Sequence, residues 1–269
     1  MEETISVRQG EELDKEALHC FLMKAITNYP VKGKLEISQF PAGASNLTYL
    51  LCKNDWQAVL RRPPLGPLPP KAHDMKREYD FLSALAPSFS YAPKPLALGV
   101  NTEVMDVVFY VMERREGIVL DTAFPAHIKG TMLEGQQVSE LLIDTLVNLH
   151  QIEPNQTGIG HFGKPEGFME RQVVGWIGRY ERAQTEEIAE YLELARWLKE
   201  KIPSTSEARI IHNDFKFNNM LFSRDLSEVR AVVDWEMATV GDPLFDLGVV
   251  LSYWTEPSDP IELRKCSLR

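Results

Sequence analysis

The sequence predicts an α+β fold made of two lobes, a small antiparallel sheet in residues 1–114 and a mainly helical part in residues 115–269. Two observations support this prediction. Short apolar runs separated by turn-forming residues fill the chain before Arg114, whereas apolar residues recur at spacings of three and four after it. A length of 269 residues is compatible with one large domain or with two lobes that share a cleft.

The first part begins with a helical pattern and continues with strands. Apolar residues between Glu11 and Tyr29 recur with helical spacing, and Pro30 helps to end this helix. Three runs rich in apolar and β-favouring residues follow, at 34–40, 46–53 and 57–61. We expect these runs to form consecutive antiparallel strands.

A proline-rich segment separates these strands from the rest of the first part. Residues 63–70 read PPLGPLPP, and we expect an exposed loop there because proline lacks the N–H donor of a central strand. Residues 71–85 then show helical spacing, and strand-like runs follow at 95–100 and 107–113. The predicted order of this part, after its first helix, is therefore β-β-β-α-β-β.

The second part is predicted to be mainly helical. Helical spacing covers residues 138–151, 168–183 and 187–201. Two short strand-like runs, at 219–223 and 229–234, flank the polar turn SRDLSE. The sequence contains no internal repeat.

Composition excludes several classes of protein. Hydrophobic residues make up 44% of the chain and charged residues 25%, as in globular proteins that fold in water. The formal net charge of −10 argues against a protein that binds nucleic acid, which normally presents a basic face. A few local cations would nevertheless suffice for a nucleotide site.

The chain also lacks the signals of a membrane or exported protein. No apolar run reaches the roughly 18 residues that span a bilayer, and the acidic start MEETISVRQGEELDKE does not resemble a signal peptide. Cys20, Cys52 and Cys266 show no metal-ligand spacing, as expected of reduced thiols. We therefore expect a cytoplasmic location.

The segment IIHNDFKFNNMLF carries the most specific chemical signal. It places His212, Asp214 and Asn219 in the order His-x-Asp-x4-Asn before an apolar run, which is the spacing of a kinase catalytic loop. In such a loop the Asp accepts or orients the proton of the substrate hydroxyl, and the Asn binds magnesium. We assign these roles to Asp214 and Asn219, and expect His212 to brace the loop. The alternative is an ordinary turn, in which Asp and Asn are common.

A second acidic motif follows at the kinase spacing. An apolar strand ends in Asp234, 20 positions after Asp214 (234 − 214), where a kinase carries its second metal ligand. A carboxylate and an amide oxygen, completed by triphosphate oxygens and water, form the ligand set that magnesium prefers. Asn219 and Asp234 are therefore the candidate metal ligands, and Glu236 is a candidate for a weaker contact.

Taken together, the motifs resemble those of the aminoglycoside phosphotransferase and choline kinase superfamily, whose members share the bilobal fold of protein kinases. The resemblance is closest to the kinase-like domains attached to acyl-CoA dehydrogenase family members ten and eleven and to their free-standing bacterial counterparts. It implies ATP and Mg²⁺ as cofactors and a small-molecule hydroxyl acceptor. The motifs that carry it are FPAGASNLTYLL, VLRRPP, KREYDFL, FYVMER, IIHNDFKFNN and VVDWEMATVGDPLFDLG.

The resemblance places the nucleotide phosphates near a hairpin turn of the first lobe. Gly43, Ser45 and Asn46 occupy the position of the glycine-rich loop of protein kinases, and offer backbone amides and a hydroxyl. A lone glycine in a hairpin is more often a plain turn requirement. These three residues are nucleotide-site candidates because the later motifs accompany them.

Arg61 and Glu78 stand where a kinase has its strand lysine and the helix glutamate that pairs with it. Arginine departs from the general kinase pattern, although its guanidinium is a competent phosphate ligand. The alternative is a surface arginine and a surface glutamate without a shared role.

FYVMER resembles the end of the fifth strand and the hinge between lobes, where the resemblance implies that adenine meets the backbone of Met112, Glu113 and Arg114. Core packing is the alternative for the apolar side chains of this run. The resemblance further implies that Asp246, in GDPLFDLG, braces the catalytic loop through its backbone.

Three functions remain open from the sequence. The first is phosphorylation of a hydroxyacyl-CoA, which the attachment of similar domains to acyl-CoA dehydrogenases favours. The second is phosphorylation of an aminoglycoside or another small alcohol, and the third is a nucleotide-binding pseudokinase module. Resembling kinases usually continue further beyond the position of Trp254, so we also expect a truncated or altered C-terminal part; the oligomeric state stays open.

Overall fold

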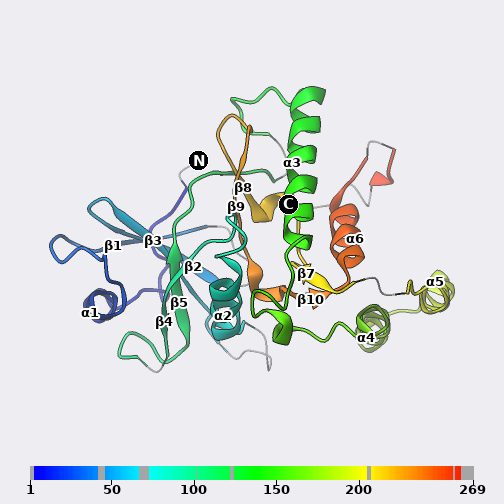
Figure 1. Ribbon diagram of the computed structural model, residues 1–269, viewed down its shortest axis with the longest axis horizontal. Helices are drawn as coiled ribbons and strands as arrows, with labels where there is room; N and C mark the ends of the chain where they lie inside the picture. The colour runs from blue at the N-terminus through cyan, green and yellow to red at the C-terminus, as the bar shows by residue number, and fades with distance from the viewer. Residues whose placement is uncertain are drawn as a thin grey trace. The chain divides into compact units, whose positions relative to one another are not determined.

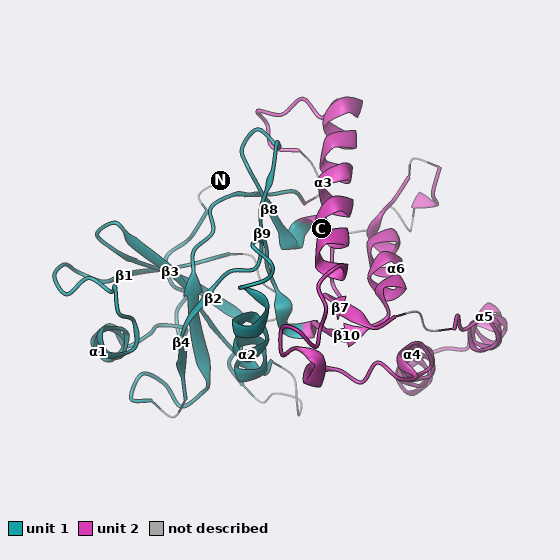
Figure 2. Ribbon diagram, in the orientation of Figure 1, with its two compact units in different colours: residues 1–120, 218–236 teal, residues 121–217, 237–269 magenta. Residues whose placement is uncertain are grey.

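The computed structural model divides into two compact units (Figure 2). The first unit comprises Met1–Leu120 and Asn218–Glu236, and the second comprises Asp121–Phe217 and Met237–Arg269. The sequence prediction divided the chain once, after residue 114, whereas in the structure a later segment belongs to the first unit because its strands pair there. The structure describes residues 3–41, 46–66, 73–100, 102–121, 124–204, 207–256 and 258–261.

The first unit is built on a five-stranded antiparallel sheet with the strand order β1-β2-β3-β5-β4 (Figure 1). Its helices and strands follow one another in the predicted order, and the predicted α+β fold class is confirmed. Their bounds are α1 Lys15–Ala25, β1 Glu36–Gln39, β2 Leu47–Lys53, β3 Trp56–Arg62, α2 Met75–Leu85, β4 Pro95–Gly99, β5 Phe109–Glu113 and β6 Ile118–Val119.

Helix α1 begins later than its apolar pattern suggested. The side chain of Asp14 accepts hydrogen bonds from the backbone N–H groups of Glu16 and Ala17, and so caps the helix at that point. The predicted proline loop after β3 lies partly outside the described residues, which stop at Gly66 and resume at His73.

Helices α1 and α2 cover opposite faces of the sheet (Figure 1). Because side chains alternate along each strand, successive residues of a strand point to different helices. Leu60 and Phe109 point to the face of α1 and join its buried Leu18 in one apolar core. The next residues along the same strands, Arg61 and Tyr110, point to the face of α2. The strand period therefore aims Arg61 at the helix that carries Glu78.

A hairpin of β8 Met220–Phe222 and β9 Val229–Val232 pairs with β6 and completes a three-stranded sheet in the first unit. Asp225 closes its polar turn, because its carboxylate accepts hydrogen bonds from Ser223 and Ser227. Hydrogen bonds from the Ser223 and Ser227 side chains lower the pKa of Asp225 to about 2. The hairpin thus has a locally stabilised turn at one end, and its open end leads to Asn219 and Asp234.

The second unit contains four α-helices and a two-stranded sheet among its described residues. Helix α3 begins six residues before its predicted start, since Thr131 and Glu134 form a capping box there. Both α3 and α6 contact β7, and α4 contacts α5. The bounds are α3 Met132–His150, α4 Phe168–Ala183, α5 Ala189–Glu200, β7 Arg209–Ile211, β10 Thr239–Gly241 and α6 Pro243–Tyr253. None of the helices in the described part is both long and apolar enough to cross a membrane.

Candidate active site

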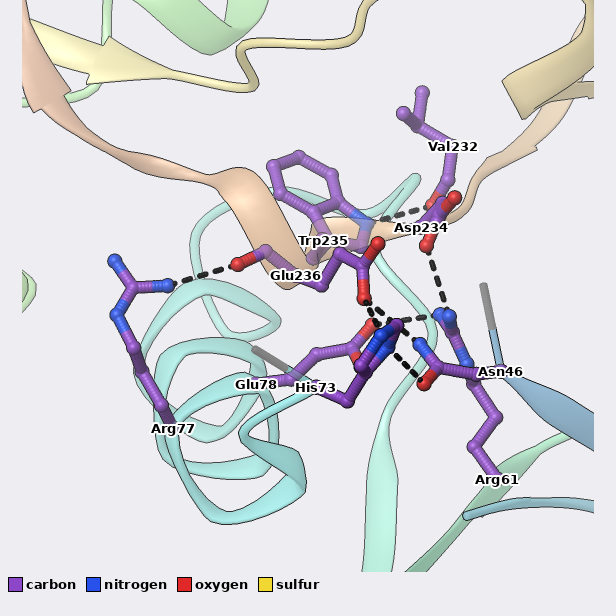
Figure 3. A network of polar contacts seen from close by, with 9 residues as sticks. All are labelled: Asn46, Arg61, His73, Arg77, Glu78, Val232, Asp234, Trp235 and Glu236. Atoms are coloured by element: carbon purple, nitrogen blue, oxygen red, sulfur yellow. Dashed lines mark hydrogen bonds and ion pairs between the residues drawn. The ribbon is translucent and has the colours of Figure 1, made fainter. Parts of the chain in front are cut away.

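Arg61 joins two carboxylates in the first unit. Its Nη1 donates to Glu78 Oε1 over 2.7 Å, and its Nη2 donates to Asp234 Oδ1 over 2.8 Å (Figure 3). The side chains of Arg61 and Glu78 are 8% and 0% exposed, whereas that of Asp234 is 30% exposed. The guanidinium fork therefore ties a fully buried carboxylate to one that solvent can reach.

The charges around Arg61 keep it protonated. Burial acts to lower the pKa of Arg61, but the carboxylates of Glu78 and Asp234 and the nearby Tyr110 outweigh it, so the pKa is raised well above its ordinary value. Burial raises the pKa of the Tyr110 hydroxyl in turn, with a further contribution from Glu78. Arg61 is consequently a permanent cation at this position.

Trp235 positions the carboxylate of Asp234. Its indole is buried between Phe81 and Phe89, with ring centroids 6.1 Å and 5.8 Å away, and its Nε1 donates to the carbonyl of Val232. Asp234 itself adopts a left-handed backbone conformation with φ of 69°, which is uncommon for residues other than glycine. Residues held in this region cluster at functional sites. The packed indole thus maintains a strained residue whose side chain faces Arg61.

Asn219 and Asp234 lie at the same end of the β8–β9 hairpin. Met220 pairs with Val232, and the N–H of Val233 donates to the carbonyl of Asn219 over 2.9 Å. The two candidate metal ligands are therefore neighbours across the hairpin, although 15 positions separate them (234 − 219).

The donor set at this hairpin end fits magnesium. A carboxylate oxygen and an amide oxygen are hard ligands, and magnesium usually takes only one or two protein ligands together with phosphate oxygens and water. Among the described residues, no group of three or more His, Cys, Asp or Glu side chains forms a closed metal cage. Asn219 and Asp234 would hold the ion, while Arg61 already neutralises one carboxylate oxygen.

A second polar network links the start of β2 to the residue after Trp235. Asn46 Nδ2 donates to Glu236 Oε2 over 2.8 Å, and His73 Nδ1 lies 2.9 Å from Asn46 Oδ1 (Figure 3). Arg77 on α2 donates to the backbone carbonyl of Glu236 over 3.1 Å. Asn46, one of the predicted nucleotide residues, is thus connected to the segment that carries Asp234, whereas Gly43 and Ser45 lie outside the described residues.

The predicted adenine-binding residues take part in local contacts of the first unit. Met112 is buried in β5 opposite Val59, and the N–H of Glu113 donates to the carbonyl of Lys94. Arg114 donates to the side chains of Gln57 and Glu3. A role of Met112, Glu113 and Arg114 in adenine binding stays a prediction.

Asp214 belongs to the second unit, where Lys216 and Tyr253 contact its carboxylate. Lys216 Nζ lies 3.0 Å from Asp214 Oδ1, and the hydroxyl of Tyr253 on α6 donates to the same oxygen over 3.4 Å. The ammonium of Lys216 also lies 4.8 Å from the centre of the Tyr253 ring. Burial lowers the pKa of Lys216, but its hydrogen bond and charge interaction with Asp214 outweigh this and raise it.

Asp246 braces the backbone of the segment before Asp214, the contact that the resemblance implied. Its carboxylate is fully buried and accepts hydrogen bonds from the N–H groups of His212, over 2.8 Å, and Asn213, over 2.7 Å. His150, the last residue of α3, donates to the same carboxylate over 3.1 Å. Asn213 has a φ of 66°, a conformation that asparagine tolerates better than most residues. The side-chain amide of Asn213 also donates to the carbonyl of Met237 over 2.8 Å, so the residue before Asp214 is fixed by hydrogen bonds to two other segments of this unit.

Sequence reasoning did not single out Lys216, Tyr253 or His73. Lys216 follows Asp214 by two positions, so a lysine inside the catalytic motif was an available signal. Tyr253 and His73 stand outside the recognised motifs, and their neighbours in space are distant in the chain. Only the packing of the elements brings them to Asp214 and Asn46, respectively.

Comparison with known protein families shows to which family the chain belongs. The sequence model of the phosphotransferase enzyme family matches residues 36–265. The chain belongs to this family. The resemblance to aminoglycoside phosphotransferases and to the kinase-like domains of acyl-CoA dehydrogenase family members is thereby confirmed.

Two curated relatives illustrate the second resemblance. This phosphotransferase-family chain is 32% identical over 258 residues to acyl-CoA dehydrogenase family member 11 of Gallus gallus, covering 95% of the chain and 33% of that protein. It is 32% identical over 260 residues to family member 10 of Mus musculus, covering 96% of the chain and 24% of that protein. The chain therefore spans a third or less of the length of these relatives.

Solved structures share the fold of the phosphotransferase-family chain. A candidate aminoglycoside phosphotransferase from Ralstonia eutropha JMP134 superposes with a TM-score of 0.78 at 28% identity, covering 92% of this chain and 72% of that one. A thermostable mutant of aminoglycoside phosphotransferase APH(4)-Ia, solved with ADP and hygromycin B, gives a TM-score of 0.60 at 17% identity, covering 88% and 77%. The second likeness shows the fold alone.

Proposed function

We propose that this protein is an ATP- and magnesium-dependent phosphotransferase that phosphorylates a hydroxyl group of a hydroxyacyl-CoA. The observation that supports it most is the hairpin end that places Asn219 beside Asp234, with Arg61 donating to Asp234 and to Glu78 at once. Phosphoryl transfer needs positioning and charge neutralisation more than covalent chemistry, and this arrangement offers both.

The nucleotide would bind in the first unit. Arg61 offers a permanent cation on the face of the sheet that α2 covers, and the Nη2 that donates to Asp234 could donate to a phosphate oxygen instead. The complex of APH(4)-Ia with ADP supports a nucleotide as the phosphoryl donor for this fold. Glu78 would keep the arginine in place while it exchanges Asp234 for a phosphate.

Asn219 and Asp234 would hold a magnesium ion, whose positive charge would offset that of the triphosphate. Asp214 would orient the acceptor hydroxyl and accept its proton as the acceptor oxygen bonds to the γ-phosphorus. The bond from the γ-phosphorus to the β-phosphate oxygen breaks, and ADP leaves with that oxygen. Asp246 would keep Asp214 in position through the backbone of His212 and Asn213.

The proposed acceptor follows from the relatives. Two proteins that the chain resembles over nearly its whole length are named acyl-CoA dehydrogenase family members. We expect a domain joined to such an enzyme to act on an acyl compound, and phosphorylation would convert a hydroxyl into a better leaving group. The neighbours named for aminoglycosides make those compounds the competing acceptor class.

The test is a transfer assay with the full chain, ATP and magnesium. Separate reactions contain a 4-hydroxyacyl-CoA, the corresponding free hydroxy acid, choline or hygromycin B, and phosphorylated acceptor is followed by mass spectrometry. We expect transfer to the hydroxyacyl-CoA that stops when magnesium is chelated.

Two results would contradict parts of this proposal. Transfer to hygromycin B or choline, with none to a hydroxyacyl-CoA, would reject the acceptor and retain the phosphotransferase activity. Magnesium-dependent ATP binding without transfer to any acceptor would instead favour a nucleotide-binding module without turnover.

A further inference from the structure

A cavity of about 170 Å³ lies next to Asp214 in the second unit. Two of the residues that line it, Lys216 and Tyr253, contact the Asp214 carboxylate. Leu142 on α3 and Val250 on α6 also line it. The cavity therefore adjoins the residue that we propose to act on the acceptor hydroxyl.

The described walls of this cavity are mainly apolar. Leu142 and Val250 are only 1% and 3% exposed, so their side chains are held in place by the surrounding core. The rings of Phe217 and Trp254, which also line the cavity, contact each other with centroids 5.6 Å apart. The size suits a small aliphatic group, since an engineered apolar cavity of about 150 Å³ in another protein binds benzene.

The charges at the cavity disfavour a cationic ligand. None of the described residues that line it is acidic, and Lys216 contributes a positive charge. The neighbouring carboxylate of Asp214 is already paired with that lysine over 3.0 Å. An ammonium group placed here would add a second positive charge beside Lys216 without a free carboxylate to compensate it, and would lose its hydration.

We infer that this cavity binds the uncharged aliphatic chain of the acceptor, next to the carboxylate that Lys216 and Tyr253 orient. The inference deepens the proposed function and rests on it, because Asp214 must act on the acceptor for the cavity to be the acceptor site. The substrate class is an aliphatic alcohol or acyl compound, and the class excluded is a polycation that depends on several carboxylates.

The first test measures binding in the absence of nucleotide. Butan-1-ol and hexan-1-ol are titrated into the full chain, and binding is followed by ligand-observed NMR. Each additional buried methylene strengthens binding by roughly fourfold, so hexan-1-ol should bind roughly ten- to twentyfold more tightly than butan-1-ol. Equal affinities for the two alcohols would overturn the inference.

Two tryptophan variants locate the binding. Trp254→Ala removes one wall of the cavity, and Trp197→Ala on α5 is the matched control, since the two residues are 39% and 55% exposed. We expect Trp254→Ala to weaken hexan-1-ol binding at least fivefold, roughly what the loss of a large apolar contact gives, and Trp197→Ala to leave it unchanged. Leu142→Phe, which fills the cavity from α3, should weaken hexan-1-ol in the same way and checks the result independently. Equal effects of the cavity and control variants would overturn the inference.

The second test concerns charge. Hexan-1-amine has the same chain as hexan-1-ol, and we expect it to bind more weakly to the wild-type protein. Lys216→Met should reduce this difference, whereas Lys199→Met, which removes an exposed lysine of α5, should not. An amine that binds as tightly as the alcohol would overturn the inference.

The binding tests and the transfer assay distinguish failure of the cavity assignment from failure of the proposed function. Retained binding of hexan-1-ol without phosphorylation of any hydroxylated compound would reject the proposed function and leave an aliphatic binding site. Transfer to a hydroxyacyl-CoA that is unaffected by Trp254→Ala and Leu142→Phe would reject the cavity as the acceptor site and leave the proposed function.

Discussion

Arg61 Nη2 donates to Asp234 Oδ1 over 2.8 Å, although the two residues are 173 positions apart in the chain. The other end of the same guanidinium fork, Nη1, donates to Glu78. This geometry requires an arginine at position 61. A lysine has a single ammonium and cannot hold two carboxylates with the same geometry, so the exchange of arginine for lysine would not be conservative here.

The first prediction concerns this fork. Arg61→Met should destabilise the protein by about 3–5 kcal/mol, because it leaves the buried Glu78 carboxylate without its cation. The free energy of unfolding from urea denaturation measures this loss. The double variant Arg61→Met with Glu78→Met should recover most of it, since it removes both charges. A double variant as unstable as the single one would contradict the explanation.

The second prediction concerns the metal ligands. Asp234→Ala and Asn219→Ala should each raise the magnesium concentration needed for tight binding of a nonhydrolysable ATP analogue, since each removes one of two oxygen ligands. Calorimetric titration of the analogue at several magnesium concentrations measures this. Asp225→Ala, in the turn of the same hairpin, is the control and should behave as the wild type. Unchanged magnesium dependence in both ligand variants would reject the proposed metal site.

The third prediction concerns Asp214. Asp214→Asn should reduce kcat by ~10²–10⁴-fold, as expected when a positioned general base is removed, and should leave the affinity for nucleotide unchanged. The matched control is Asp144→Asn, an exposed position on α3. Steady-state kinetics on the acceptor found in the transfer assay would measure kcat. Turnover close to that of the wild type would show that Asp214 is not the base.

A fourth prediction follows from the buried carboxylate of Asp246. Asp246→Asn replaces one acceptor oxygen with an amide that cannot accept, so a backbone N–H of His212 or Asn213 loses its partner. We expect a loss of about 1.5–3 kcal/mol in the free energy of unfolding, the usual contribution of a hydrogen bond to a charged group. A fall in kcat without a change in nucleotide affinity should accompany it. Full activity in a destabilised variant would limit Asp246 to a structural role.

The fifth prediction is the pH dependence of the Lys216–Asp214 pair. Because the pKa of Lys216 is raised in the folded protein, the pair contributes stability below the ordinary lysine pKa of about 10.4 and loses it as the pH rises through the raised value. The difference in Tm between wild type and Lys216→Met should therefore stay constant from about pH 7 to 9.5 and decrease above about 10.4. Lys199→Met should show no such change. A difference that disappears below pH 9 would contradict the raised pKa.

The sequence by itself determined the local part of this site. His212, Asp214 and Asn219 lie within eight residues of one loop, so their spacing alone indicates a catalytic motif. The order of the strands and helices was likewise predictable, because the periods of two and 3.6 residues depend only on neighbouring positions. The ends of α1 and α3 were less accurate, since capping side chains set them.

Only the tertiary structure decided which side chains meet. The bond from Asn46 to Glu236 joins residues 190 positions apart, and the bonds from Asp246 to the catalytic-loop backbone span 33 and 34 positions. Such contacts depend on how segments that are distant in the chain pack against one another, which the spacing of neighbouring residues does not determine. The same reason explains why Tyr253, on the last described helix, was not recognised as a neighbour of Asp214. Packing placed its hydroxyl there, and with it one wall of the cavity that we assign to the acceptor.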